Sequence, residues 1–315
     1  MLQVEHLTRR YGPVTAVDDL SFTISKVGVY GFLGPNGAGK STTMNIMTGC
    51  LSATGGTVKI SGYDIYDQPR EAKRRIGYLP EQPPLYLGET PEEYLRFVGE
   101  AKGLRGDALR RQMEVAIEET GIGEMRGRRI DALSKGYRQR VGIAQALLGN
   151  PEIVILDEPT VGLDPLQILD IRALIASLGK TRTVLISSHI LSEVQTMCSK
   201  ILIIAHGKLV AFDTPERLEE QLSSPGEIFL SADTDAAAAL ALLEGLPGAA
   251  SAVVTAEETG SSRLTVTAGT DDLYTLSREI FRAFAASGNT LSELRVKKAT
   301  LEDIFLELTE GGEHP

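Results

Sequence analysis

Over roughly the first two thirds of the chain, short apolar runs alternate with amphipathic stretches. Three runs are apolar almost throughout, which is typical of strands buried on both faces of a sheet; they span residues 27–34, 152–157 and 182–187. Apolar residues recur with helical spacing in five stretches, at residues 91–103, 107–120, 136–148, 165–178 and 190–196. The alternation predicts an α/β fold in which helices cover a mainly parallel sheet.

Three segments have a different pattern. The first 25 residues and the segments 57–61 and 201–212 carry β-type runs that are less uniformly apolar. We predict that they form antiparallel strands at an edge of the fold.

The pattern is broken at residues 223–226, where Ser, Pro and Gly cluster. Such a cluster indicates a loop, and we place a domain boundary there, between residues 1–222 and 223–315. The elements predicted beyond it are a strand (227–231), a helix (235–244), two strands (251–256 and 262–268), a helix (271–286) and a strand (291–297). This order predicts a small α+β domain with a split βαβ or ferredoxin-like fold.

A last amphipathic helix is expected at residues 300–309. One face of it would carry Leu301, Ile304, Phe305 and Leu308.

Composition narrows the classes of function. The chain has 315 residues, of which 42% are hydrophobic and 23% charged, and this excludes a disordered or fibrous protein. A net charge of -10 argues against nucleic acid as a partner, because phosphate backbones are bound by clustered Lys and Arg. Cys50 and Cys198 are too few for a disulfide framework; we expect two buried thiols in a reducing cytoplasm. The longest purely apolar stretch, residues 236–243, is far shorter than the roughly 20 residues that span a bilayer.

The sequence GPNGAGKST, residues 34–42, has the spacing of a phosphate-binding loop, and it lies between a buried strand and a helix expected to open at Lys40. Backbone N–H groups and the positive end of that helix can surround a triphosphate. Lys40 would supply positive charge to the β and γ phosphates, and the Ser41 hydroxyl would bind Mg²⁺. The residues expected to line the nucleotide are Gly34, Asn36, Gly37, Ala38, Gly39, Lys40, Ser41 and Thr42.

A second candidate site is EIVILDEPT, residues 152–160, in which an apolar strand ends in two adjacent carboxylates. Carboxylates are costly to bury without a counterion. We predict that Asp157 helps to hold Mg²⁺ and that Glu158 acts as the general base toward the attacking water. Alone, the pair could equally be an ordinary strand end beside a solvated turn, and the phosphate-binding loop favours the catalytic interpretation.

The segment LSKGYRQR, residues 133–140, starts an amphipathic helix with Ser134 as a candidate N-cap. It resembles the LSGGQ signature of ABC ATPases and precedes the two carboxylates at that family's usual interval. The resemblance covers residues 2–220. It implies a P-loop NTPase fold of the ABC type with an antiparallel β subdomain and a helical subdomain.

The resemblance assigns further residues. Tyr11 would stack on adenine, with a plain core or surface tyrosine as the alternative; Asp164 lies in the loop that links two ATP sites; and His189 would contact the γ phosphate. Ser134 and Gly136 would contact phosphate in the ATP site of a second subunit.

The sequence departs from the family pattern at two places. Glu81 stands where the family usually has a glutamine that acts at the metal, so that role is in doubt, because a further carboxylate would repel the γ phosphate. Lys135 and Tyr137 replace the usual residues of the signature.

The form of these motifs and of the C-terminal ATLEDIFLELT most resembles the ABC-2 exporter branch, which includes drug-export and gliding-motility ATPases. That resemblance implies an ATPase using ATP and Mg²⁺, paired as a homodimer or with another ATPase subunit. It would power a transmembrane permease from the cytoplasmic face of the membrane as a peripheral subunit. The C-terminal domain would be a regulatory or docking module. The alternatives are a soluble ABC protein of translation or DNA repair, and a regulator that binds nucleotide without hydrolysing it.

Overall fold

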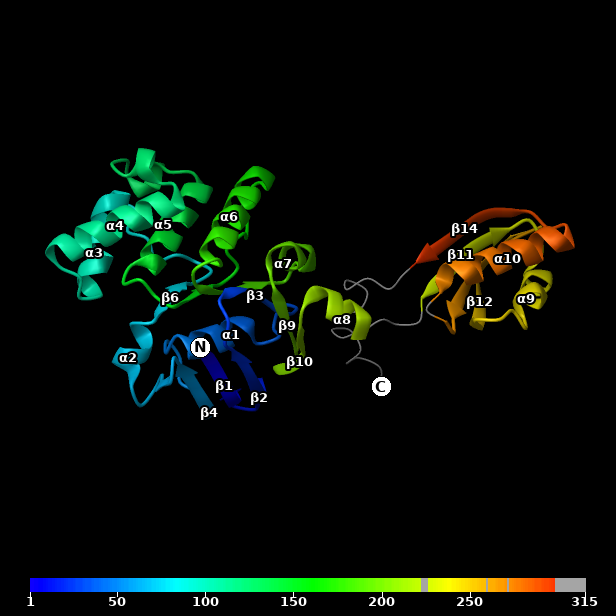
Figure 1. The fold of residues 1–315 in the computed structure, drawn as a ribbon, viewed down its shortest axis with the longest axis horizontal. Coiled ribbons are helices and arrows are strands. Elements are labelled where there is room, and N and C mark those ends of the chain that lie inside the picture. Colours follow the sequence, from blue (N-terminus) through cyan, green and yellow to red (C-terminus); the bar gives the residue numbers. More distant parts are fainter. Residues whose placement is uncertain (222–225, 259, 271, 298–315) are drawn as a thin grey trace. The chain divides into compact units, whose positions relative to one another are not determined.

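The computed structural model describes residues 1–221, 226–258, 260–270 and 272–297, and the chain divides into two compact units, Met1–Pro215 and Glu216–Pro315 (Figure 1). The division falls after Pro215, ahead of the boundary predicted between residues 222 and 223. Most of the predicted boundary loop and the helix expected at 300–309 lie outside the described residues.

The first unit is built on a six-stranded sheet with the order β10-β9-β3-β8-β7-β6. Neighbouring strands from β9 to β6 are parallel, and β10 pairs antiparallel with β9. The strands are β3 (Gly28–Leu33), β6 (Ile76–Leu79), β7 (Ile153–Leu156), β8 (Thr183–Ser188), β9 (Lys200–Ala205) and β10 (Lys208–Asp213). The three predicted buried strands are therefore confirmed. One prediction was wrong: β9 lies parallel to β3 and is buried along nearly all its length, because its apolar run KILIIA suits a position inside the sheet.

A second, antiparallel sheet has the order β2-β1-β4-β5 and confirms the strands expected in the first 25 residues and at 57–61. Its strands are β1 (Leu2–Tyr11), β2 (Val14–Ile24), β4 (Gly55–Ile60) and β5 (Tyr63–Asp64). Its inward-facing side chains share one hydrophobic core with β3 and with helix α1 (Lys40–Met47). Phe22 and Phe32, for example, lie with their ring centroids 6.1 Å apart. This shared core fixes the start of α1 against the end of β3.

The helices of the first unit match the predicted ones within one or two residues. Helices α3 (Pro91–Ala101), α4 (Gly106–Thr120) and α5 (Lys135–Leu147) pack on one another and form the helical subdomain (Figure 1). Helix α6 (Pro165–Leu178) follows β7, and α7 (Leu191–Met197) follows β8. The remaining helical segments of this unit are α2 (Pro69–Lys73) and two 3₁₀ turns, Gly123–Met125 and Ile130–Ala132. Helix α8 (Pro215–Gln221) starts where the first unit ends.

The second unit has the predicted element order. It consists of β11 (Glu227–Ala232), α9 (Ala236–Leu243), β12 (Ala249–Glu258), β13 (Ser261–Ala268), α10 (Leu273–Ser287) and β14 (Leu291–Lys297). The sheet order is β12-β13-β11-β14 and all pairs are antiparallel, which is the topology of two interleaved βαβ halves. Alternate residues of β11 face a core completed by Leu276, Ile280 and Phe284 of α10.

Two expectations about the whole chain can be compared with the structure. In the described ranges no helix has both the length and the apolar character needed to cross a bilayer. Both cysteines are free thiols, but only Cys198 is buried as expected; Cys50 is exposed just after α1.

Candidate functional site

The loop between β3 and α1 is folded tightly around the amine of Lys40. Lys40 Nζ donates hydrogen bonds to the backbone oxygens of Gly34, at 2.7 Å, and Pro35, at 3.1 Å. Gly39 has φ 100°, and a Cβ at this position would lie 2.4 Å from the Ala16 carbonyl oxygen, so only glycine fits. The loop therefore closes on itself at the amino end of α1, where backbone N–H groups can bind an anion.

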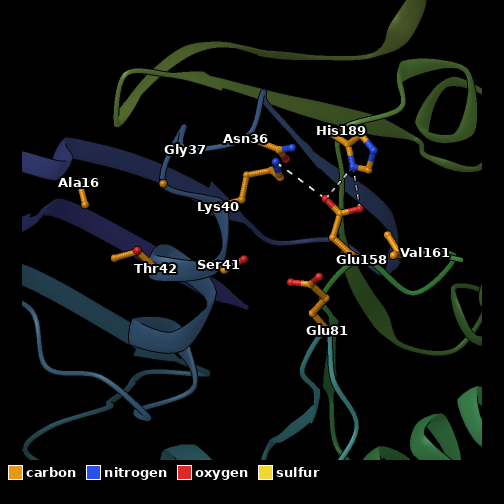
Figure 2. A pocket seen from close by; sticks show the side chains of 11 residues that line it. Ala16, Asn36, Gly37, Lys40, Ser41, Thr42, Glu81, Glu158, Val161 and His189 are labelled. Carbon is orange, nitrogen blue, oxygen red and sulfur yellow. Dashed lines mark hydrogen bonds and ion pairs between the residues drawn. The ribbon is translucent and has the colours of Figure 1, made fainter.

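A cavity of about 320 Å³ opens at this loop (Figure 2). Its walls come from the loop and α1, from the segment after β6, and from the segments after β7 and β8. The lining residues are Ala16, Asn36, Gly37, Gly39, Lys40, Ser41, Thr42, Glu81, Glu158, Val161 and His189. The carboxyl ends of parallel strands thus converge on the phosphate-binding loop, as is usual for ligand sites in open α/β sheets.

Asp157 and Glu158 follow β7 directly and are 2% and 8% exposed. Glu158 has φ 47°, a left-handed conformation that costs a non-glycine residue about 1–3 kcal/mol. One hydroxyl holds both residues: Ser187 Oγ of β8 donates to Asp157 Oδ1 at 2.6 Å and accepts from the Glu158 N–H at 2.7 Å. Strain of this kind persists where the surroundings over-determine it, and it aims the Glu158 side chain into the cavity.

A lysine amine and a histidine ring meet the Glu158 carboxylate. Lys40 Nζ lies 3.8 Å from its Oε1, and His189 Nδ1 lies 3.1 Å from its Oε2 (Figure 2). Burial lowers the pKa of Lys40, and the negative charges of Glu158, Asp157 and Glu81 oppose that shift. The carboxylates thus help to keep a nearly buried amine charged, ready for an anion.

Glu81, two residues after β6, lines the same cavity, although the sequence left its role at the metal in doubt. The strand itself is fixed by the Asp157 N–H, which donates to the Leu79 carbonyl at 2.9 Å. Burial, aided by the charge of Asp157, raises the pKa of Tyr78 in β6 and keeps its hydroxyl neutral. Asp157 thus contacts the end of β6 through its backbone and acts on Tyr78 through its charge.

The arrangement suits a polyphosphate with a divalent metal. A glycine-rich loop and Lys40 can bind phosphate oxygens, while Glu158 can accept a proton from water. The described residues contain no group of three or more His, Cys, Asp or Glu side chains that could hold a metal alone. A hydroxyl and a carboxylate from Ser41 and Asp157, completed by phosphate oxygens and water, fit Mg²⁺, which usually takes one or two protein carboxylates beside substrate phosphates.

Several predicted site residues do not line the cavity. Tyr11 ends β1 with 45% of its surface exposed, and the Arg9 guanidinium lies 4.6 Å from its ring centroid. Ser134 caps α5 by accepting from the Tyr137 N–H, as predicted, and Asp164 caps α6 in the same way. The others outside the lining are Gly34, Ala38, Gly136 and Asp157.

Sequence reasoning missed four residues that hold or line the site. Ser187, Thr160 and Val161 belong to the predicted motifs or their flanks, but no spacing pattern singled them out. Ala16 comes from β2, which the sequence places far from the loop. Only the tandem serines before His189 offered a signal, since two hydroxyls at the end of a buried strand need partners.

Comparisons with known proteins point the same way as the geometry. Residues 17–161 match the family model for the ABC transporter. The linearmycin resistance ATP-binding protein LnrL of Bacillus subtilis (strain 168) is 35% identical over 98% of each chain. The bacitracin transport ATP-binding protein BcrA of Bacillus licheniformis is 39% identical over 67% of this chain and 68% of its own. A solved structure described as an ATP-binding subunit of an ABC transporter is 32% identical, with a TM-score of 0.63 over 70% of this chain and 92% of that one.

Proposed function

This chain belongs to the ATP-binding, ATP-hydrolysing subunits of ABC transporters, and from that premise we propose that it drives export through a separate membrane permease. The observation that carries the proposal is the convergence of Lys40, Glu158 and His189 on one cavity at the phosphate-binding loop. The named relatives serve bacitracin transport and linearmycin resistance, which supports export of an antimicrobial natural product.

Within the site, each residue has a proposed task. The loop N–H groups and Lys40 bind the β and γ phosphates, and Lys40 leaves its present carbonyl partners to do so. Glu158 accepts the proton of the attacking water, and His189 orients Glu158 and the γ phosphate. Ser41 and Asp157 would hold Mg²⁺, which supplies charge neutralisation of the phosphates.

We assign Ser134, Gly136 and Asp164 to a site completed by a second subunit. Ser134 and Asp164 are exposed at the amino ends of α5 and α6, and none of the three residues lines the cavity of its own chain. An exposed helix start can still bind phosphate supplied by another chain. Two copies closing around two ATP molecules would bring these residues to the phosphates, and ATP would bias that closure.

The proposed permease contact begins beside Glu81. Tyr86, Leu87 and Phe97 are each about half exposed, at 51%, 49% and 51%. The ring centroid of Tyr86 lies 5.2 Å from that of Phe97 and 5.8 Å from that of the buried Tyr94. An exposed aromatic cluster of this kind is typical of a protein–protein contact. Through it the chain would sit peripherally at the cytoplasmic face of the membrane and pass movement at Glu81 to the permease.

The C-terminal unit is proposed as a regulatory or docking module. LnrL, a resistance ATP-binding protein, matches this chain across its whole length, so the module is shared with a relative of related function. Residues 223–315 would then act on the assembly of the transporter while the chemistry stays in the first unit.

The test is Mg²⁺-dependent phosphate release and ATP-dependent dimerisation by wild type and Glu158→Gln. We expect Glu158→Gln to keep ATP binding, to lose hydrolysis by about 100-fold or more, and to accumulate as a dimer. Glu5→Gln is the matched control, because Glu5 is exposed and pairs only loosely with Lys59, at 3.7 Å. Retained hydrolysis in Glu158→Gln would contradict the catalytic role. Nucleotide binding without phosphate release, even with the permease present, would favour a regulator.

A further inference from the structure

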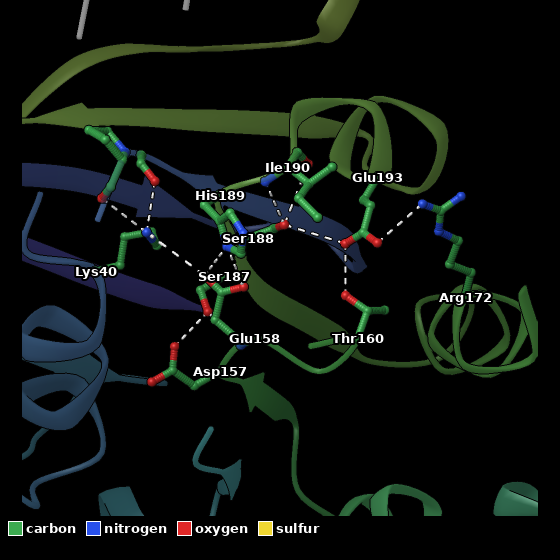
Figure 3. A network of polar contacts seen from close by, with 12 residues as sticks. Lys40, Asp157, Glu158, Thr160, Arg172, Ser187, Ser188, His189, Ile190 and Glu193 are labelled. Carbon is green, nitrogen blue, oxygen red and sulfur yellow. Dashed lines mark hydrogen bonds and ion pairs between the residues drawn. The ribbon is translucent and has the colours of Figure 1, made fainter. Parts of the chain in front are cut away.

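A buried carboxylate lies behind the cavity, on α7, and the cavity does not include it. Glu193 is 3% exposed, although its helix starts at the surface. Its Oε2 accepts a hydrogen bond from Thr160 Oγ1 at 2.7 Å and a longer one from Ser188 Oγ at 3.4 Å. Its Oε1 lies 3.4 Å from Arg172 Nη2 (Figure 3).

The three partners of Glu193 come from three segments that serve the site. Thr160 is two residues beyond Glu158, and Ser188 immediately precedes His189. Arg172 is on α6, the helix that Asp164 caps. A single side chain therefore connects the loop after β7, the loop after β8 and α6.

We propose that Glu193 is a positioning residue that keeps Glu158 and His189 in register with each other. Beyond the ends of their strands, both loops gain side-chain contacts from Glu193 in addition to backbone turn hydrogen bonds such as that from the Val161 N–H to the Glu158 carbonyl. We expect these side-chain contacts to fix where each loop leaves its strand. The contact between His189 Nδ1 and Glu158 Oε2 spans 3.1 Å, and it is kept only while both loops hold their places. The inference rests on the catalytic roles proposed for Glu158 and His189.

The contacts of Glu193 orient neighbouring groups more than they stabilise the fold. Ser188 Oγ, which reaches Glu193, also accepts the Ile190 N–H at 3.0 Å, so the same hydroxyl shapes the backbone on either side of His189. The Nε of Arg172 is buried and makes no hydrogen bond in the part of the chain that the structure describes. Arg172 therefore leaves part of its hydrogen-bonding capacity unused and supports Glu193 through Nη2 alone.

The first test removes one hydrogen bond of Glu193 without changing the shape of the side chain that donates it. Thr160→Val deletes the hydroxyl that binds Glu193 and keeps the volume. We expect kcat for ATP hydrolysis to fall about tenfold and KM for ATP to stay within about twofold, because small misplacements at reacting groups cost rate more than binding. The matched control is Thr196→Val on α7, whose hydroxyl bonds only to backbone oxygens of its own helix, those of Ser192 and Glu193. It should leave both constants unchanged.

Two variants of Glu193 separate positioning from mere packing. Glu193→Gln keeps an oxygen that can accept from Thr160, so we expect it to retain more of kcat than Glu193→Ala does. The double variant Thr160→Val with Glu193→Ala should lose less than the product of the two single losses, because each change removes the hydrogen bond between these two residues.

The inference is overturned if Thr160→Val behaves like Thr196→Val, or if the losses of Thr160→Val and Glu193→Ala multiply. It is also overturned if each variant loses kcat only in proportion to its folded fraction, measured by circular dichroism under the assay conditions. A separate outcome concerns the underlying roles. If Glu158→Gln itself still hydrolyses ATP, the proposed catalytic base is wrong. If Glu158→Gln loses hydrolysis while the Thr160 and Glu193 variants keep the kcat of wild type, Glu158 remains the proposed base and the positioning role of Glu193 is wrong.

Discussion

The two units of the chain bury very different residues. In the first unit one group of buried polar side chains lies at or next to the cavity, and it includes Lys40, Asp157, Glu158, Ser187 and Glu193. In the described part of the C-terminal unit the only buried polar residue is Ser262. Its core is otherwise made of aliphatic side chains and Phe284.

The two units therefore differ in how their buried residues affect stability. A buried polar group costs about 1–3 kcal/mol when its partners are missing, so a fold gains nothing by collecting such groups unless the chemistry needs them. The first unit holds them by mutual hydrogen bonds, as Ser187 does for Asp157 and Glu158. In its described part, the core of the C-terminal unit relies on the burial of apolar side chains.

The largest effect should follow from removing the lysine amine that faces the cavity, in Lys40→Met. We expect ATP hydrolysis to fall by about 10³-fold, because a preorganised donor to developing charge is worth about 10²–10³-fold. Phosphate release at saturating ATP measures it. Lys59→Met is the control, since that lysine is 40% exposed and pairs with Glu5 at 3.7 Å. A loss smaller than about tenfold would mean that Lys40 does not act on the phosphates.

The next effect belongs to the C-terminal unit, in Phe284→Ala. Phe284 is fully buried in its core, so we expect that unit to lose about 3 kcal/mol of unfolding free energy or more. Urea unfolding measures the loss, and Phe281→Ala on the same helix, with 58% of Phe281 exposed, is the control. The ATPase rate of the folded protein should not change. A parallel loss of hydrolysis would show that the second unit takes part in the chemistry.

A smaller effect is expected for Ser187→Ala, which leaves Asp157 and the Glu158 N–H without their shared partner. We expect the first unit to lose about 2 kcal/mol of unfolding free energy, within the range for an unsatisfied buried group. Urea unfolding of this variant beside Ser192→Ala, an exposed serine of α7, measures it. Unchanged stability would mean that the strained conformation of Glu158 is held by other contacts.

The sequence predicted those features that depend on residues close together in the chain. The phosphate-binding loop, the Ser134 cap and the element order of the C-terminal unit each depend on neighbours within a few residues, and the structure has all three. Residues 201–212 were predicted as antiparallel strands at an edge, which holds for the pairing of β10 with β9 but not for β9 beside β3, because a buried apolar run fits parallel or antiparallel pairing. Its place beside β3 follows from the packing of the whole sheet.

The supports of the site could not be predicted in the same way. Ser187 meets Asp157 across 30 residues of sequence, and Glu193 meets Thr160 across 33. Such contacts depend on which strands lie side by side and on the direction of each side chain, and no spacing rule encodes them. Tyr11 shows the same limit at a single residue. Its place in the family pattern predicted a role in stacking on adenine, but its contact with Arg9 depends on the fold.

The smallest effect tests whether a desolvated charge in the first unit always serves the site. Lys102 follows α3 away from the cavity, and although the residue is exposed overall, its amine donates to the carbonyls of Gln145, at 3.0 Å, and Leu148, at 2.8 Å, at the end of α5. Desolvation of the amine lowers its pKa to about 8. The unfolded state, with a pKa near 10.5, then binds more protons between these two values.

The unfolding free energy of wild type should therefore rise relative to that of Lys102→Met as the pH increases from about 8 toward 10.5. Below about pH 8 both states are protonated, and the cost of desolvating the charge is present in full. Urea midpoints of both proteins, measured at about pH 7 and about pH 9.5, give the difference, and Lys59→Met, which removes an exposed lysine, is the control. A difference that stays constant would mean that water reaches the amine freely. A rise with no change in ATP hydrolysis would show that this lysine serves the helical subdomain alone, and that a desolvated charge marks the active site only where it faces the cavity.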